Sequence, residues 1–395
     1  FMGYEAGGGT WTNAASNYNV GIGNYVMDSA LAGVQYTTAV GMNALSAVTS
    51  GQNNSVFGTQ AGTSITTGND NIAIGTQAML THTTGGRNIA IGSKVMDDTN
   101  AGSNSLNSVD NVFIGYNAGG GTWTDADSNR NVTLGNYTMA GATAGALDSV
   151  AVGHYALSAV TSGDYNTALG SNAGLSLTSG FSNVIIGYLA GDAMTATDNT
   201  VLIGVNAGGA INSADADGSV GVGRDALQDL TSGQNNTAVG YRALADLITG
   251  NYNTAVGYGA LDAILTGNDN VAVGWGAGGS TSNTTGTNNT FIGSNAGNQI
   301  INKNDHTFIG YRAGATNRAG YASTIIGSHA GYDPKGATYS GSANLFAGYG
   351  AGYHIGGDDV VALGAYAGYY TTGSYNTFVG KQAGRGGTTV APYSS

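Results

Sequence analysis

The stretch NYNTAVGYGALDAILTGNDNVAVGWGAG, residues 251–278, decides the fold, because its second half repeats its first half. The shared motif is an Asn, a small and an aliphatic residue, a glycine, an aromatic residue and then an Ala. The glycine that follows the aliphatic residue is called the anchor glycine, and the chain holds 22 such copies, from Gly3 to Gly380. The 21 spacings between anchors run from 16 to 23 residues, and 17 occurs 11 times. A period near 17 is too short for paired-helix repeats and predicts one coil of a β-solenoid.

Residue types are fixed by their position relative to the anchor glycine. Position −1 is Val, Ile, Leu, Met or Phe in 21 of 22 copies, and position +3 is Ala in 19. Position −4 is Asn in 14 of the 21 copies that reach that far. A strand alternates its faces, so positions −3 and −1 point the same way, and we expect that way to be inward. Val256, flanked by Val239 and Val273 in adjacent coils, is then predicted to lie in a buried aliphatic stack.

Each column of the repeat has a predicted physical role. The anchor glycine allows a close backbone approach, the Ala at +3 lets a neighbouring strand or subunit come near, and the Asn at −4 forms ladders along the stack. A loop glycine, as at 51, 163, 233, 250 and 267, suits a tight turn with positive φ. The residues assigned to this scaffold are Gly58, Gly75, Gly240, Gly257, Gly274, Val239, Val256, Val273, Ala243, Ala260, Ala277, Asn253 and Asn270.

Composition narrows the classes of function. Glycine makes up 69 of 395 residues, and charged residues are only 9%. The net charge of −12 offers no basic stripe for phosphates, so no nucleic-acid partner is expected. The chain has no cysteine, which excludes disulfides and thiolate chemistry. No apolar run approaches 18 residues, so no membrane insertion is expected.

The array is expected to run continuously over residues 1–387. Residues 388–395 leave the repeat and are interpreted as a tail or the start of a further segment. The chain begins within a motif, which favours a fragment of a longer protein. A coil of about 17 residues buries only a few aliphatic side chains, so we expect oligomerisation to supply further burial.

The stretches NNSVFG (53–58), DNIAIG (70–75) and RNIAIG (87–92) resemble the repeats of the left-handed parallel β-roll heads of trimeric autotransporter adhesins. The longer forms TAVGYRAL and VFIGYNAG resemble repeats of bacteriophage tail fibres, and the long coil favours that type. The resemblance implies a homotrimeric, extracellular fibre on a virion or a cell surface. Its implied role is to present a region that binds a polysaccharide or protein receptor on the host cell. A bacterial surface adhesin or extracellular filament is the alternative.

No catalytic or cofactor motif is present. The histidines at 82, 154, 306, 329 and 354 are scattered, and we expect them in solvated loops or on the surface. We therefore predict no enzyme activity, no metal and no cofactor. A polysaccharide-degrading solenoid enzyme is the remaining alternative, and it requires two carboxylates about 5–9.5 Å apart. Asp125 and Asp127, like Asp215 and Asp217, are interpreted as acidic turns, with Ca²⁺ binding left open.

Aromatic residues are the candidates for ligand contact. Position +1 is Tyr in seven copies, and Trp275 takes the same place. Trp11 and Trp123 lie in the duplicated loop GGGTWT. Rings on the flank of a fibre stack on sugars, although a ring column also packs against neighbouring coils or subunits. Packing is the favoured interpretation for the +1 column, and for Trp11 and Trp123 both interpretations stay open.

Overall fold

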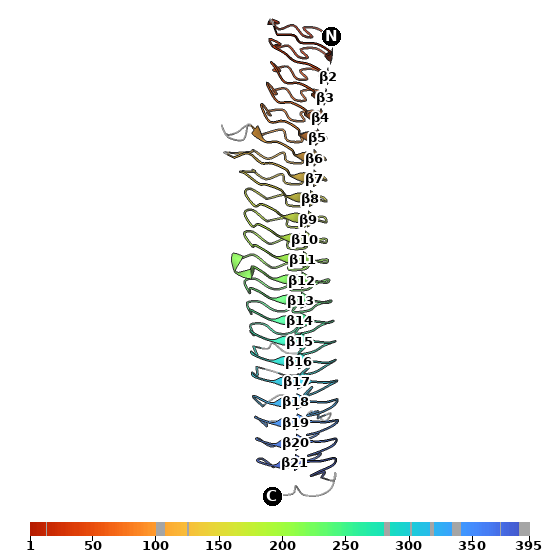
Figure 1. The fold of residues 1–395 in the computed structure, drawn as a ribbon, viewed down its shortest axis with the longest axis vertical. Helices are drawn as coiled ribbons and strands as arrows, with labels where there is room; N and C mark the ends of the chain where they lie inside the picture. The colour runs from red at the N-terminus through yellow and green to blue at the C-terminus, as the bar shows by residue number, and fades with distance from the viewer. Residues whose placement is uncertain are drawn as a thin grey trace. The chain divides into compact units, whose positions relative to one another are not determined.

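The computed structural model describes residues 1–12, 14–99, 107–124, 126–279, 285–300, 302–316, 320–333, 341–371 and 373–386. The predicted tail, 388–395, lies outside these described residues. The chain divides into two compact units, Phe1–Asn199 and Thr200–Ser395. Each unit is a stack of coils with one three-residue strand per coil, and the strands of each unit lie one above the next (Figure 1). The all-β parallel solenoid predicted from the repeat is confirmed.

The described residues of the first unit form ten strands, each paired in parallel with the next along the chain. They are β1 (Val20–Ile22), β2 (Thr38–Val40), β3 (Ser55–Phe57), β4 (Ile72–Ile74), β5 (Ile89–Ile91), β6 (Val112–Ile114), β7 (Val132–Leu134), β8 (Val150–Val152), β9 (Thr167–Leu169) and β10 (Val184–Ile186).

The second unit contains eleven strands and one 3₁₀ turn, η2 (Ala214–Ala216), among its described residues. Its strands are also parallel, with equivalent repeat positions paired. They are β11 (Val201–Ile203), β12 (Val220–Val222), β13 (Thr237–Val239), β14 (Thr254–Val256), β15 (Val271–Val273), β16 (Thr290–Ile292), β17 (Thr307–Ile309), β18 (Thr324–Ile326), β19 (Leu345–Ala347), β20 (Val361–Leu363) and β21 (Thr377–Val379).

The anchor glycines end the strands and stack on one another. All of them have φ between 118° and 145°, where an L side chain is strained. A Cβ added to Gly240 or Gly257 would lie 2.5 Å from the carbonyl oxygen of the next anchor glycine. Gly58, Gly75 and Gly274 face the next anchor glycine in the same way. The glycine is therefore needed both for its backbone conformation and for the close approach of the next coil.

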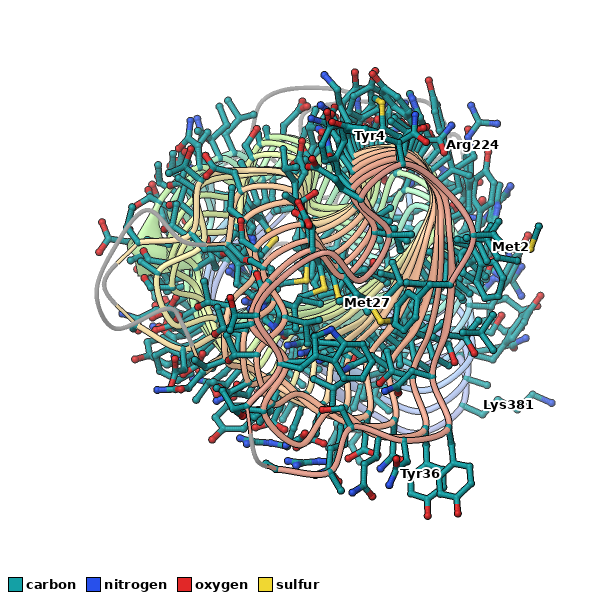
Figure 2. The ribbon with its side chains drawn as sticks, turned by 90° about the horizontal axis from the view of Figure 1, so that it is seen from above. Met2, Tyr4, Met27, Tyr36, Arg224 and Lys381 are labelled. Carbon is teal, nitrogen blue, oxygen red and sulfur yellow. The ribbon has the colours of Figure 1, made fainter. Side chains whose placement is uncertain are left out.

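The predicted facing of the strands is wrong. In β14 the middle residue, Ala255 at position −2, is fully buried, whereas Val256 at −1 is 37% exposed. Val239 and Val273 are 37% and 39% exposed, so the whole −1 column faces outward. The alternation of faces was correct, but the inward residue of each strand is the middle one, at −2. Figure 2 shows the same split in the first coils, where Met27 lies inside and Met2 projects outward.

In most coils the side chains at positions −2 and +4 have complementary sizes and together fill the core. A large residue at −2 accompanies glycine at +4, as in Phe308 with Gly314. Leu or Met at +4 always accompanies a small residue at −2, as in Leu244 with Ala238, whereas Ala168, Ala272 and Ala362 are small −2 residues that accompany glycine at +4. A Cβ added to Gly314 would lie within 3 Å of the Phe308 ring, which shows that the two positions share one space. Because interiors are close-packed, this complementarity of size identifies the inward face.

The Ala residues at +3 line the interior. Ala243, Ala260 and Ala277 are fully buried within their own coils. Their small size thus serves packing inside the coil, and they do not form a contact surface for a neighbouring subunit.

The Asn residues at −4 form a buried hydrogen-bonded ladder. Asn253 donates from Nδ2 to the carbonyl oxygen of Gly267, 2.8 Å away, and its Oδ1 accepts the backbone N–H of Asn270 at 3.1 Å. Asn270 repeats the pattern with the carbonyl of Gly286, and both side chains are fully buried. Each side-chain amide therefore satisfies polar groups of the next coil, which a buried site requires.

The loop glycines differ from the prediction. Gly51, Gly163, Gly233, Gly250 and Gly267 do not have a positive φ. A Cβ on Gly51 would lie 2.5 Å from the carbonyl oxygen of Gly68 in the next coil. Glycine is thus required there by close stacking, and the carbonyls of Gly250 and Gly267 also accept the ladder amides of Asn236 and Asn253.

Candidate functional site

The outward face of the strands, called here the sheet face, is formed by positions −3 and −1 of each strand; position −1 is apolar throughout, and position −3 is Val, Ile, Leu, Thr or Ser. In every strand these two residues are partly or largely exposed, while the middle residue is at least partly buried. Leu134, Leu169 and Val379 are 52%, 48% and 67% exposed. Parallel strands lie about 4.8 Å apart, so ten strands give a face on the order of 45 Å long. Monomeric proteins rarely expose such a continuous apolar surface.

A second surface is the aromatic column at position +1. Tyr241, Tyr258 and Trp275 belong to successive coils and stack on one another, with ring centroids 5.1 and 6.4 Å apart. They are 37%, 55% and 56% exposed, so each ring also presents surface to solvent. The column therefore packs on itself along the stack and still offers rings for contact.

The two tryptophans of the duplicated loops lie in different environments. Trp11 is 49% exposed and packs edge-on against Phe1, with centroids 6.0 Å apart. Trp123 is fully buried beside Phe113, and its backbone N–H donates to the carbonyl of Asp98. Both indoles donate to a glycine carbonyl four residues earlier. Trp123 is therefore a core residue in this structure, and its candidacy for ligand contact is corrected.

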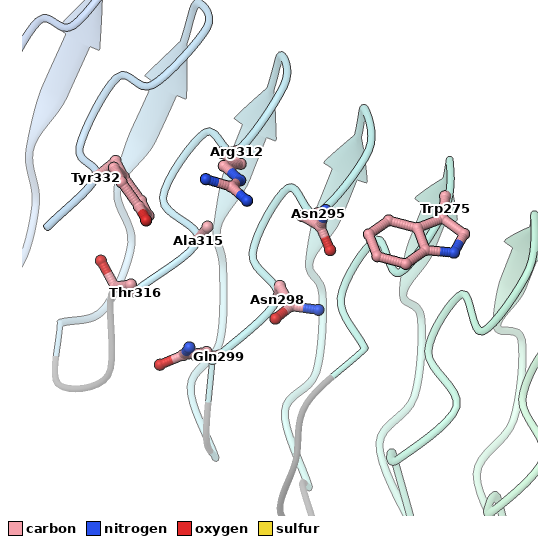
Figure 3. Close-up of a pocket in the computed structure, with 8 residues that line it drawn as sticks. All are labelled: Trp275, Asn295, Asn298, Gln299, Arg312, Ala315, Thr316 and Tyr332. Carbon is pink, nitrogen blue, oxygen red and sulfur yellow. The ribbon is translucent and has the colours of Figure 1, made fainter. Parts of the chain in front are cut away.

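Three hollows follow one another along the second unit, and together they are called the aromatic groove. The first has a volume of about 180 Å³ and is lined by residues that include Tyr258, Asp262 and Trp275. The second, about 190 Å³, lies between Trp275 and Tyr332, with Asn295, Asn298 and Arg312 between them (Figure 3).

The third hollow has a volume of about 220 Å³ and is lined by His329, Tyr349, Tyr353, Tyr366 and Tyr369 among others. The first two hollows share Trp275, Asn295 and Asn298. The second adjoins the third because the Tyr332 ring lies 5.6 Å from His329 and 5.8 Å from Tyr353. The +1 column predicted from the sequence includes Tyr258, Trp275 and Tyr349, but the other residues of the groove were not predicted.

Three ionisable groups of the groove have pKa values shifted toward the neutral form. Burial raises the pKa of the Asp262 carboxyl, and the nearby Asp246 adds to the shift. Burial and the charge of Arg312 lower the pKa of His329. Burial, with the neighbouring Tyr370, raises the pKa of Tyr369 to about 12. At neutral pH the imidazole of His329 and the phenol of Tyr369 are thus uncharged hydrogen-bonding groups, and the guanidinium of Arg312 also lines the groove.

Two histidines belong to the core, contrary to the expectation of surface positions. His306 occupies the −4 position of the Asn ladder and is 1% exposed. Its Nε2 donates to the carbonyl of Gly320 at 3.1 Å, and its Nδ1 accepts the backbone N–H of Ser323 at 3.2 Å. A neutral imidazole in this tautomer reproduces the donor and acceptor of the Asn side chain. Burial lowers the pKa of His306 to about 4, and that of the buried His82 likewise.

In the described part of the chain, no three His, Asp or Glu side chains gather in a way that would hold a metal ion. Asp125, one of the two carboxylates of the acidic turn predicted at 125–127, lies outside the described residues. Within the same ranges, no helix has the length and apolar character needed to cross a membrane. A search of protein-family models and of curated proteins found no match to this chain.

Proposed function

We propose that this chain is a non-enzymatic structural segment of an extracellular fibre and that it assembles as a homotrimer through the sheet face. Stacked coils with one repeated unit fit a fibre-like structural role. The observation that carries the proposal is the outward −1 column of each unit, in which residues such as Ile22, Ile74 and Ile326 are about 40% exposed. Covering this column with another apolar surface would be favourable by about 25 cal/mol for each Å² buried.

The periodicity of the sheet face favours a copy of the same chain as its partner. Every strand presents the same two positions at the spacing of a parallel sheet. A partner that covers this surface along its length must repeat at the same spacing. A second and a third copy of the chain meet that requirement in every coil, and the number three rests on the resemblance to the β-roll heads.

The finer assignment rests on the same resemblance. We propose a bacteriophage tail fibre that extends and presents a region that binds a host receptor, with a bacterial surface adhesin or filament as the alternative. The flanking reading frame distinguishes them. A membrane-anchor barrel after this segment would identify an adhesin, and a chaperone-like or tip domain would identify a phage fibre.

Native mass spectrometry tests the self-association. The parent protein is expected at three times the mass of one chain. A variant with Val239, Val256 and Val273 all changed to Lys should shift toward monomer with its β-sheet circular dichroism retained. The control is Ile248→Lys, because Ile248 is 38% exposed but lies outside the strands. A monomeric parent, or a triple variant that assembles like the parent, would overturn the proposal.

A further inference from the structure

The aromatic groove is marked by a sequence feature that the repeat alone does not require. Only three of the 22 copies carry an aromatic residue at +1 followed by glycine at +2. They are Tyr258–Gly259, Trp275–Gly276 and Tyr349–Gly350. All three pairs lie in the second unit, and each glycine lines one of the hollows.

The backbone does not explain these glycines. Gly259, Gly276 and Gly350 have φ of 57–60°, but Asn295 and Arg312 hold the same repeat position with φ of 55° and 54°. The left-handed conformation at +2 is therefore compatible with ordinary side chains in this fold. Glycine at these three copies instead leaves a space where the other copies place a side chain.

The missing side chains open the hollows. A Cβ added to Gly276 would lie 3.0 Å from Oδ1 of Asn295 and 3.4 Å from Nδ2 of Asn298. A Cβ added to Gly350 would lie 3.1 Å from the Tyr366 ring. Longer side chains at either position would extend into the hollow and cover the ring that precedes the glycine. The glycines thus keep the faces of Trp275 and Tyr349 accessible.

The chemistry of the walls indicates the class of ligand. The rings of Tyr258, Trp275 and Tyr349 are 51–56% exposed, and the amides of Asn295 and Asn298 line the same hollows as Tyr258 and Trp275. Aromatic faces suit the apolar faces of pyranose rings, and amides suit their hydroxyl groups. Arg312 lies with its guanidinium over the Tyr311 and Tyr332 rings, at 5.3 and 5.7 Å, so its charge is already engaged.

The spacing of the groove fits a chain ligand. Each hollow is smaller than the 300–1,000 Å³ typical of a single enclosed ligand pocket. The hollows instead succeed one another along the stack, where each coil advances by about 4.8 Å. An extended chain of pyranose rings advances by a comparable length per sugar, so successive sugars meet successive coils.

We propose that the aromatic groove, from Tyr258 to Tyr369, binds an uncharged polysaccharide chain laid along the stack of the second unit. The proposal extends the proposed function by naming a ligand class and its site. The aromatic groove does not include the sheet face. Loss of assembly and loss of polysaccharide binding can therefore be observed independently of each other. A proline-rich peptide, which also binds aromatic grooves, is the competing occupant that the experiment must separate.

The test is binding of the intact protein to an array of linear neutral oligosaccharides, with acidic oligosaccharides and proline-rich peptides printed beside them. The glycan with the highest affinity for the protein is then titrated by calorimetry. We expect neutral glycans to bind and Trp275→Ala to weaken them about three- to tenfold, the range for one aromatic contact. Gly276→Asn, which installs the side chain that Asn295 already carries at +2, should weaken binding at least as much by filling the hollow.

Tyr188→Ala is the matched control, because Tyr188 is a +1 tyrosine that is 53% exposed but is followed by Leu189 instead of glycine. It should bind like the parent, and all three variants should keep the parent's melting curve and oligomeric mass. Absence of neutral-glycan binding, equal binding by Gly276→Asn, or binding of proline-rich peptides that Gly276→Asn abolishes would each overturn the proposal. Loss of assembly in the parent with glycan binding retained would count against the proposed function alone.

Discussion

The two faces of one strand both carry apolar side chains, but the surroundings of those side chains differ. In β14, Ala255 points inward and is fully buried, and Val256 points outward and is 37% exposed. The inward residue is matched by its coil, because a large residue at −2 is always accompanied by glycine at +4, and Leu or Met at +4 by a small residue at −2. The outward residue has no such match within the described chain, although it is aliphatic in almost every copy. The comparison shows that apolar character repeats on both faces, whereas complementary volume marks only the core.

The largest expected effect comes from placing a carboxylate on each face in turn. Ala255→Asp buries an unpaired charge in the interior, which costs several kcal/mol, so this variant should lose its folded second unit. Val256→Asp should leave the single-chain fold intact and weaken assembly, with a melting temperature that falls as the protein is diluted. Circular dichroism melts of both variants at two concentrations measure the difference. Equal and concentration-independent melts would show that the faces are not distinct.

The next effect compares the two duplicated loops. Trp123→Ala removes a fully buried ring and should cost about 3–5 kcal/mol, whereas Trp11→Ala, at an exposed ring, should cost about 0.5 kcal/mol. Urea denaturation of the two variants measures both costs. Similar losses would mean that the exposure of Trp11 does not reflect its packing in solution.

A smaller effect is a pH dependence that arises from the ladder histidine. The pKa of His306 is lowered by burial from 6.5 to about 4, so the unfolded chain takes up a proton at a higher pH than the folded chain. The stability from the neutral ring is complete above pH 6.5 and is lost as the pH falls from about 6.5 to about 4. The loss is about 3 kcal/mol at most for this residue.

His306→Asn restores the residue found at −4 in most copies and should flatten that part of the pH profile. Urea melts of parent and variant from pH 7.5 to pH 4 measure the difference, and His82 remains unchanged in both. A variant whose stability falls with pH as steeply as that of the parent would rule out His306 as the source.

The sequence allowed the fold class and the coil register to be predicted, because a 17-residue period and the anchor glycines leave few alternatives. The Asn ladder was also predictable, since an amide at a fixed position can satisfy the backbone of the next coil. The facing of the strands was mispredicted because the aliphatic −1 column was taken as the core. The complementary sizes of −2 and +4, as in Phe308 with Gly314, were the signal that would have corrected it.

The groove was only partly predictable. Trp275 was singled out as a rare exposed-type residue, and the glycine after it was visible in the sequence. The hollows themselves depend on side chains from positions +2 and +5 of neighbouring coils, such as Asn295 and Asn298. Which of these positions meet across coils follows from the path of each turn, which the repeat pattern does not specify.

The most direct test of the central claim is the reactivity of single thiols, because the native chain has no cysteine. Val256→Cys and Ile248→Cys replace residues that are 37% and 38% exposed in the single chain. If copies of the chain cover the sheet face, Val256→Cys should react with a soluble thiol reagent at least about tenfold more slowly than Ile248→Cys. This protection should disappear when Val239 and Val273 are both changed to Lys in the Val256→Cys variant. Equal rates for the two thiols in the assembled parent background would contradict the claim that the sheet face is an interface.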